Sequence, residues 1–200
     1  MMLRSLQAPQ SALPSASATA TAPALWRVAI NFAAFQLAWF ACVAGAARGT
    51  PWLGVFVAMA AVAAHASISA RPRRELVLVL VAIAFGAVYD SSIAALGWIT
   101  YNSGEFVPGI APHWILALWA LFATTLNVSL RWLRGRRVAA ALVGAVAGPL
   151  SYYAGERLGA LVLVEPVAAT LALAVGWAIF TPVLIEIAQR CDGVCPVDAS

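Results

Sequence analysis

Long uncharged stretches alternate with short polar segments along most of the chain. Each stretch is roughly 20 residues long, the length at which an α-helix crosses the hydrocarbon layer of a membrane. The segments between them carry most of the arginines and several of the prolines and glycines that turn the chain. This pattern predicts an all-α membrane protein, a bundle of six transmembrane helices. The expected helices are residues 26–47, 52–70, 75–96, 113–133, 138–164 and 167–189.

The basic residues are distributed unevenly between the two sides of this bundle. All 12 are arginines, and helices of alternating direction place all but Arg48 and Arg157 on the side that holds both termini. Because arginine-rich loops stay in the cytoplasm, both termini are expected there. Arginine without lysine, together with abundant alanine, is typical of GC-rich bacterial genomes. The expected location is therefore a bacterial inner membrane, which the chain crosses several times.

Composition leaves no room for a sizeable soluble domain. Hydrophobic residues make up 63% of the chain and charged residues 10%, whereas soluble domains average about 45–50% apolar and about 25% charged residues. We expect a disordered cytoplasmic tail over residues 1–24, a transmembrane domain over 25–190 and a short cytoplasmic tail over 191–200. The net charge of +4 comes from arginines at helix ends and not from a basic stripe, so no nucleic-acid partner is expected.

Asp90 is the strongest candidate for a functional residue. It lies about 22 Å into the third expected helix, at about 1.5 Å per residue. A carboxylate inside a bilayer is costly, so it must bond to neighbouring helices or stay protonated. One interpretation makes Asp90 a proton relay, cation site or substrate anchor. The other makes it an interhelical hydrogen bond that holds the bundle together.

Uncharged polar residues in three other helices are further candidates for a ligand site. They are Gln36 in the first expected helix, Thr124 and Asn127 in the fourth, and Ser151 and Tyr152 in the fifth. Such side chains most often form hydrogen bonds between helices. Their expected depths differ, so they could line one path or make separate structural contacts.

The fifth expected helix combines a proline with a row of small residues. Pro149 removes one backbone hydrogen bond near the middle of the membrane and is expected to break or kink the helix. Gly148, Tyr152, Gly155 and Gly159 fall on one face at helical spacing. That face predicts close packing against a neighbouring helix. A broken helix at the midplane is also how many transporters form a binding site.

The motifs of common enzymes and metal sites are absent from the sequence. It contains no Walker loop, no dinucleotide glycine fingerprint, no zinc-protease motif and no serine-hydrolase elbow. We therefore expect no metal and no cofactor, and the sequence favours a protein that is not an enzyme. His65 is expected to form a hydrogen bond to a neighbour, and Glu75 looks unremarkable near a helix end. Cys191 and Cys195 are tail thiols to which the sequence assigns no role.

Four stretches taken together resemble a known family. They are Asn31-Phe32 with Phe35-Gln36 and Trp39-Phe40, Asp90-Ser91, Leu118-Trp119 with Phe122 through Asn127, and Gly148 through Tyr152 with Ala154-Gly155. Over roughly residues 26–189 the chain is similar to bacterial membrane proteins catalogued as domain of unknown function 2878. The resemblance implies a short inner-membrane protein, whose relatives are often encoded near enzymes that modify membrane fatty acids. It also implies that the six polar candidates occupy positions which the family shares.

Three functions remain open at this point. The favoured one is a lipid-linked role, in which the protein binds or presents an acyl chain or lipid. Its partners would be membrane lipids and fatty-acid-modifying enzymes, and a homo-oligomer is compatible with this role. The second function is a small proton-coupled transporter that uses Asp90. The third is an intramembrane enzyme that modifies a lipid, for which the sequence offers no catalytic motif.

Overall fold

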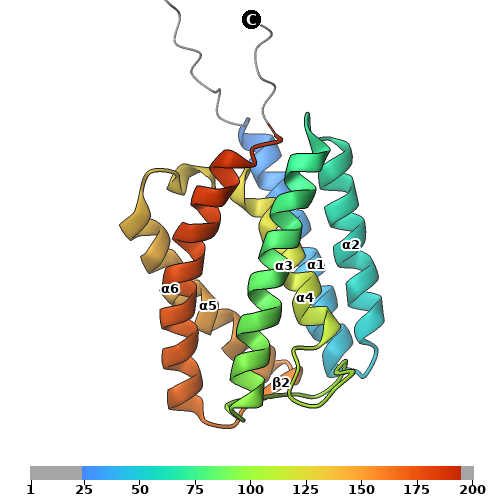
Figure 1. Ribbon diagram of the computed structural model, residues 1–200. Coiled ribbons are helices and arrows are strands. Elements are labelled where there is room, and N and C mark those ends of the chain that lie inside the picture. The colour runs from blue at the N-terminus through green and yellow to red at the C-terminus, as the bar shows by residue number, and fades with distance from the viewer. Residues whose placement is uncertain (1–23, 195–200) are drawn as a thin grey trace, which may run out of the picture.

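Residues 24–194, the part described by the computed structural model, form six α-helices and a two-stranded sheet (Figure 1). The helices are α1 (Leu25–Ala47), α2 (Pro51–Ser67), α3 (Pro72–Ala95), α4 (His113–Leu126), α5 (Arg137–Arg157) and α6 (Pro166–Arg190). The predicted tail over residues 1–24 lies outside the described residues except for its last position. Cys195 and the rest of the C-terminal tail also lie outside them.

Most helix starts agree with the sequence prediction because local signals set them. Pro51, Pro72 and Pro166 occupy the first helical position of α2, α3 and α6, where a missing backbone N–H costs nothing. Gly49, with φ of 73°, makes the left-handed turn between α1 and α2. These prolines and this glycine begin or end elements at the points where the hydropathy pattern changes.

Four of the helices within the described residues, α1, α3, α5 and α6, are long and apolar enough to cross a membrane. Helices α2 and α4 are apolar but shorter. The prediction that the fourth helix extends to residue 133 is wrong, because α4 ends at Leu126 and only a 3-10 turn follows at Arg131–Leu133. The hydroxyls of Thr124 and Thr125 donate to carbonyls three residues back, a bonding pattern that competes with regular helix.

Helix α4 is the buried centre of the bundle. Trp114, Trp119, Leu121 and Leu126 are each at most 2% exposed, and α4 packs against α1, α2 and α3. A helix that is apolar all round belongs in a protein core or a membrane. Because its neighbours surround it, α4 does not need the length of a helix that faces lipid.

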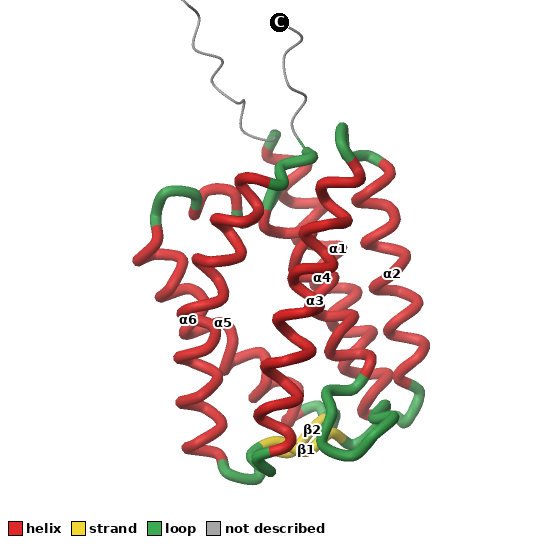
Figure 2. The backbone as a smooth tube through the Cα atoms, viewed as in Figure 1, coloured by secondary structure: helices red, strands yellow, loops and turns green. Residues whose placement is uncertain are grey.

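The two strands close the end of the bundle opposite the described termini, which we call the strand end (Figure 2). β1 (Ile99–Tyr101) and β2 (Leu161–Leu163) pair antiparallel, with Tyr101 opposite Leu161. The sequence did not predict this sheet, and the expectation that the fifth helix reaches residue 164 is wrong. Helix α5 ends at Arg157, and Gly159, with φ of 85°, turns the chain into β2. The sheet joins the α3–α4 loop to the α5–α6 loop.

Helices α5 and α6 form one closely packed pair, and α1 and α2 form another. Small residues make both approaches possible. A Cβ added at Gly54 would lie 2.3 Å from the Cα atom of Cys42, and one added at Gly148 would lie 2.3 Å from the ring of Trp177. Helices α3 and α4 lie between the two pairs (Figure 1). The end opposite the strands carries the arginines of the α2–α3 and α4–α5 connections, and we call it the arginine end.

Candidate functional site

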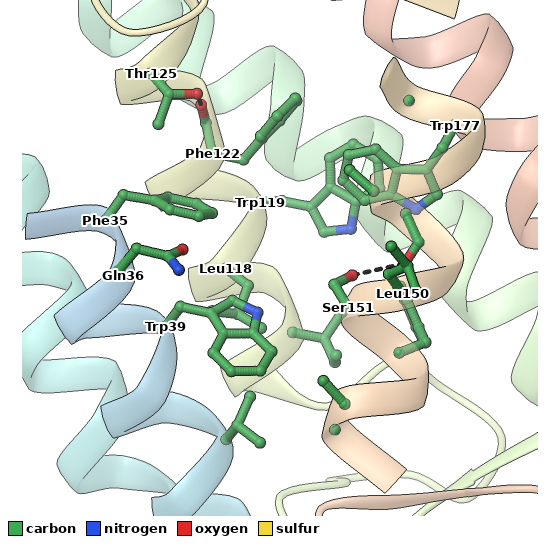
Figure 3. Close-up of a pocket in the computed structure, with 18 of the residues that line it drawn as sticks. Phe35, Gln36, Trp39, Leu118, Trp119, Phe122, Thr125, Leu150, Ser151 and Trp177 are labelled. Atoms are coloured by element: carbon green, nitrogen blue, oxygen red, sulfur yellow. Dashed lines mark hydrogen bonds between the residues drawn. The ribbon is translucent and has the colours of Figure 1, made fainter. Parts of the chain in front are cut away.

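A groove of about 600 Å³ separates α1 from α5. Figure 3 shows Phe35 and Trp39 projecting from α1 on one side and Leu150 from α5 on the other. Trp119 of α4 and Trp177 of α6 close the back of the groove, and their rings stack with centroids 4.7 Å apart. Most of the lining is therefore aromatic or aliphatic, with few polar groups.

The groove opens sideways, along the flank of the bundle. Phe32, Phe40 and Leu150 line it, yet they are 55%, 52% and 58% exposed. On α1 the lining runs from Phe32 to Val43, which corresponds to about 17 Å along the helix axis. The groove is thus an elongated slot that runs parallel to the helices and faces whatever surrounds the bundle.

Two of the polar groups that line the groove are satisfied within their own helices. The hydroxyl of Ser151 donates to the carbonyl of Gly148 at 2.7 Å, and that of Thr125 donates to the carbonyl of Phe122 at 2.7 Å. Gln36 lines the groove from α1 and is half-buried (Figure 3). Most of the remaining lining is apolar, which suits a long apolar occupant.

Asp90 lies behind the wall of this groove and is fully buried. The Trp119 indole Nε1 donates to its Oδ2 at 2.6 Å, while the hydroxyls of Tyr152 and Tyr101 donate to its Oδ1, the latter at 3.3 Å. These donors come from α4, α5 and β1, so the carboxylate connects three elements to α3. Trp119 and Tyr152 also line the groove, which places Asp90 one side chain away from it.

The sequence analysis singled out Asp90 and Tyr152 without predicting a hydrogen bond between them, and it missed the other two donors. Gly86 was the available signal for Trp119. It lies one helical turn before Asp90, and a Cβ there would lie 2.1 Å from the Trp119 ring. Tyr101 reaches Asp90 through the β1–β2 pairing, for which the sequence carries no comparable signal.

A second buried carboxylate, Glu75, lies at the arginine end of α3 and is 1% exposed. His65 Nε2 lies 2.8 Å from its Oε2, and its Oε1 accepts from the Asn127 side-chain amide at 2.8 Å and from the backbone N–H of Gly193 at 2.7 Å. The expectation that Glu75 is unremarkable is wrong. His65 does bond to a neighbour, as expected, and that neighbour is Glu75.

The C-terminal segment docks on this cluster through Asp192. Its Oδ2 accepts from Arg131 at 2.7 Å and from Arg134 at 2.8 Å, and Arg134 also donates to the side-chain oxygen of Asn127. Burial by itself raises the pKa of Asp192, but the hydrogen bond and charge of Arg134, with the charge of Arg131, lower it below its ordinary value. Residues 191–194, expected as tail, are therefore in part a packed element.

A smaller cavity of about 380 Å³ lies between α1, α2 and α4 near the arginine end. Thr124 and His65 line it, and Phe35 lines both this cavity and the groove. The backbone carbonyl of Thr124 accepts from the side chain of Asn31 at 3.1 Å. Thr124 is thus a contact between α4 and α1 at some distance from Asp90.

The six polar candidates therefore fall into separate places and not into one site. Gln36, Ser151 and Tyr152 line the groove, and Tyr152 alone of these also reaches Asp90. Asn127 belongs to the Glu75 cluster. Within the described residues there is no group of three or more His, Cys, Asp or Glu side chains placed to hold a metal ion.

The packing residues of the fifth helix are only partly where the sequence analysis placed them. Helix α5 continues through Pro149 without interruption, so the expected break is not observed. Gly148 and Gly155 share the buried face with Tyr152, as predicted. Gly159 does not, because it follows the end of the helix and makes the turn into β2.

Comparison with known proteins agrees with the resemblance seen in the sequence. Residues 28–183 match the family described as "Protein of unknown function (DUF2878)". That range runs from α1 into α6 and includes the groove, Asp90 and Glu75. No curated protein and no solved structure matches the chain. The chain belongs to the DUF2878 family, with helices of the kind that cross membranes.

Proposed function

We propose that the protein binds the acyl chain of a membrane lipid or fatty acid in the groove between α1 and α5. The observation that carries this proposal is the shape and chemistry of the groove. It is an apolar slot of about 600 Å³, within the range of about 300–1,000 Å³ common for ligand sites. Its length runs parallel to the helices, and its mouth opens on the flank where lipid tails lie in a membrane.

The proposed setting is a bacterial inner membrane, with all six helices inside it and both termini in the cytoplasm. The four long apolar helices support a multi-pass arrangement. The described chain ends lie at the arginine end (Figure 1). The positive-inside rule then places that end on the cytoplasmic side. In this orientation the strand end faces the periplasm.

Aromatic walls give the groove a means of selecting an occupant from bulk lipid. Apolar burial alone does not favour a protein groove over the surrounding hydrocarbon, because lipid tails are as apolar as leucine. Close packing against a fixed surface does favour the groove over bulk lipid. The Trp119 and Trp177 rings stack, and the ring of Phe122 meets Trp177 edge to face at 5.1 Å. These contacts hold the back wall of the groove rigid. An acyl chain that fits this wall therefore loses little packing when it leaves the surrounding lipid.

The test is direct binding of a labelled chain to the purified protein. Stearic acid brominated at the middle of its chain quenches tryptophan fluorescence on contact, and the groove is lined by Trp39, Trp119 and Trp177. We expect saturable quenching that Ala147→Phe abolishes, because Ala147 lines the groove and the larger ring fills it. Ala60→Phe is the matched control, since Ala60 is exposed on α2 and lines neither cavity. Equal saturable quenching in both variants would reject the groove as the site.

A partnership with fatty-acid-modifying enzymes is the cellular side of this proposal. A deletion strain, complemented with wild type, Ala147→Phe or Ala60→Phe at matched protein level, tests it through an untargeted fatty-acid profile. We expect a changed profile that wild type and Ala60→Phe restore and Ala147→Phe does not. An unchanged profile in the deletion strain would remove the lipid-modifying partner from the proposal, whereas chain binding by the purified protein would stand.

One observation favours a second candidate, a proton-coupled transporter that uses Asp90. Trp119 and Tyr152 connect the carboxylate to the groove, because each bonds to Asp90 and also lines the groove. Movement of either side chain would expose Asp90 to an occupant. This candidate predicts proton flux in proteoliposomes that disappears in Asp90→Asn while the variant remains folded. Flux equal to that of protein-free liposomes would reject it.

A further inference from the structure

Two hydrogen-bonding groups on the α6 wall of the groove are buried without a partner among the described residues. They are the Thr181 hydroxyl and the Trp177 indole N–H. Thr181 is 2% exposed, and both residues line the groove. Buried polar groups are nearly always hydrogen-bonded in proteins, so each exception needs an explanation.

The other hydroxyls of the groove show that this situation is specific to α6. Thr125 and Ser151 line the same groove, and each donates to a carbonyl three residues back in its own helix at 2.7 Å. Thr181 also follows a turn of its own helix, α6, whose carbonyls could accept a hydrogen bond, yet its hydroxyl makes no such bond. Its hydroxyl is therefore left for an acceptor that comes from outside the chain.

Glycines on α5 let that helix pack directly against these two residues. Thr181 and Trp177 are four residues apart on α6, so they lie on one face. A Cβ added at Gly144 would lie 2.4 Å from the Thr181 hydroxyl oxygen, and one added at Gly148 would lie 2.3 Å from the Trp177 ring. A side chain at either position would collide with α6, so both glycines are needed for this close packing. Gly144 and Gly148 line the groove as well, so the two donors and the glycines that pack against them belong to one stretch of its lining.

The position of the pair along α6 indicates which part of an occupant it meets. Thr181 lies 15 residues from the first residue of α6, Pro166, and 9 residues from the last, Arg190. At about 1.5 Å per residue these separations are about 22 Å and about 14 Å. The donors thus lie deep in the span, where a lipid presents the middle of its tail and not its headgroup.

We infer that the groove takes an acyl chain with an oxygen near its middle, a hydroxyl or a keto group, which accepts hydrogen bonds from Thr181 and Trp177. This inference rests on the proposed function and adds the chemical class of the chain. An indole N–H can only donate, so the group it meets must be an acceptor. An unmodified alkyl chain would leave both donors unpaired. An oxygenated chain satisfies them and remains apolar along the rest of the slot.

The experiment is displacement of brominated stearic acid by two unlabelled probes, stearic acid and a stearic acid hydroxylated at mid-chain. For wild type we expect the hydroxylated probe to displace at a roughly tenfold lower concentration, the effect of one or two net hydrogen bonds. Thr181→Val keeps the shape of the side chain and should bring the two concentrations close together. Trp177→Phe, which keeps an aromatic ring without the N–H, should reduce the preference in part. Thr125→Val is the matched control and should retain it, because the Thr125 hydroxyl already bonds within α4.

The possible outcomes separate this inference from the function on which it rests. Equal displacement by both probes in wild type would overturn the inference and leave acyl-chain binding intact. The same holds if Thr181→Val and Trp177→Phe both keep the full preference. If brominated stearic acid shows no saturable binding at all, the proposed function fails, and the inference fails with it.

Discussion

Helix α3 carries two buried carboxylates, Asp90 and Glu75, and their surroundings differ. Each accepts or shares three hydrogen bonds, and the two lie 15 residues apart, about 22 Å along the helix. The partners of Asp90 are aromatic side chains without charge, held inside the bundle. The partners of Glu75 include a histidine and the backbone of Gly193, and its cluster continues to Arg131, Arg134 and Asp192.

The difference shows two ways to place a carboxylate in a membrane bundle. At Asp90 rigid donors surround the group and remove it from both lipid and water, next to an apolar groove. At Glu75 the group belongs to a chain of ionisable and charged residues that ends at the partly exposed Asp192. We therefore expect the Asp90 cluster to govern packing and the groove, and the Glu75 cluster to govern attachment of the C-terminal segment.

The largest effect is expected from Asp90→Ala. It leaves the Trp119 indole and two tyrosine hydroxyls without their acceptor in a fully buried site, and we expect a loss of about 3–5 kcal/mol of stability. Thermal unfolding in detergent, followed by size-exclusion chromatography, measures it. Asp90→Asn retains one acceptor oxygen and should lose less. A variant Asp90→Ala as stable as wild type would show that the cluster does not hold the bundle.

Glu75→Ala should cost less, about 2–4 kcal/mol, because its partners belong to helix ends and to the C-terminal segment, which can rearrange more easily than the middle of the bundle. A local change in hydrogen exchange should distinguish Glu75→Ala from Asp90→Ala. Hydrogen exchange should increase at Gly193 and at the start of α3, while β1 and the groove stay protected. Glu75→Gln keeps the acceptor for Gly193 and is the matched control. Loosening at the strand end in Glu75→Ala would show that the two clusters are not independent.

The two tyrosines that bond to Asp90 offer a smaller and sharper comparison. The Tyr101 hydroxyl lies at 3.3 Å from the carboxylate, while that of Tyr152 makes the closer bond. We expect Tyr152→Phe to cost about 1–2 kcal/mol and Tyr101→Phe about 0.5 kcal/mol. Tyr152 also lines the groove, so only its substitution should alter binding of brominated stearic acid. If both variants altered binding equally, the effect would come from Asp90 itself and not from the Tyr152 side chain that lines the groove.

The parts of the fold that follow from local signals could be predicted from the sequence. The starts of α2, α3 and α6 lie within a few residues of the prediction because a proline begins each of them. The sheet could not be predicted, since Ile99 and Leu163 pair across 64 residues and each strand has only three. The end of α4 was missed because no proline or glycine stands between Leu126 and Gly135 to mark a stop, and apolar residues continue as far as Leu133.

The candidate site also has a part that could be predicted from the sequence and a part that could not. Asp90 could be singled out because a carboxylate in the middle of an apolar stretch has no ordinary explanation. Glu75 could not, since an acidic residue in the first turn of a helix is common and favourable. What makes it unusual is contact with Asn127 and Gly193, which lie 52 and 118 residues away. The two unpaired donors on α6, the Thr181 hydroxyl and the Trp177 indole N–H, could not be predicted either, because they result from packing between helices.

The smallest effect concerns Asp192, at the exposed end of the Glu75 cluster. Its pKa is lowered in the folded state, so its ion pairs with Arg131 and Arg134 stabilise the protein above the unfolded pKa of about 3.9. That stability disappears as the pH falls through the lower, folded pKa. We expect Asp192→Asn to cost about 1 kcal/mol or less at neutral pH, and less at high salt. Thermal unfolding of the variant and of wild type should therefore converge in strong acid. A difference that persists there, or that ignores salt, would mean that Asp192 acts through its neutral hydrogen bonds and that charge does not hold the C-terminal segment.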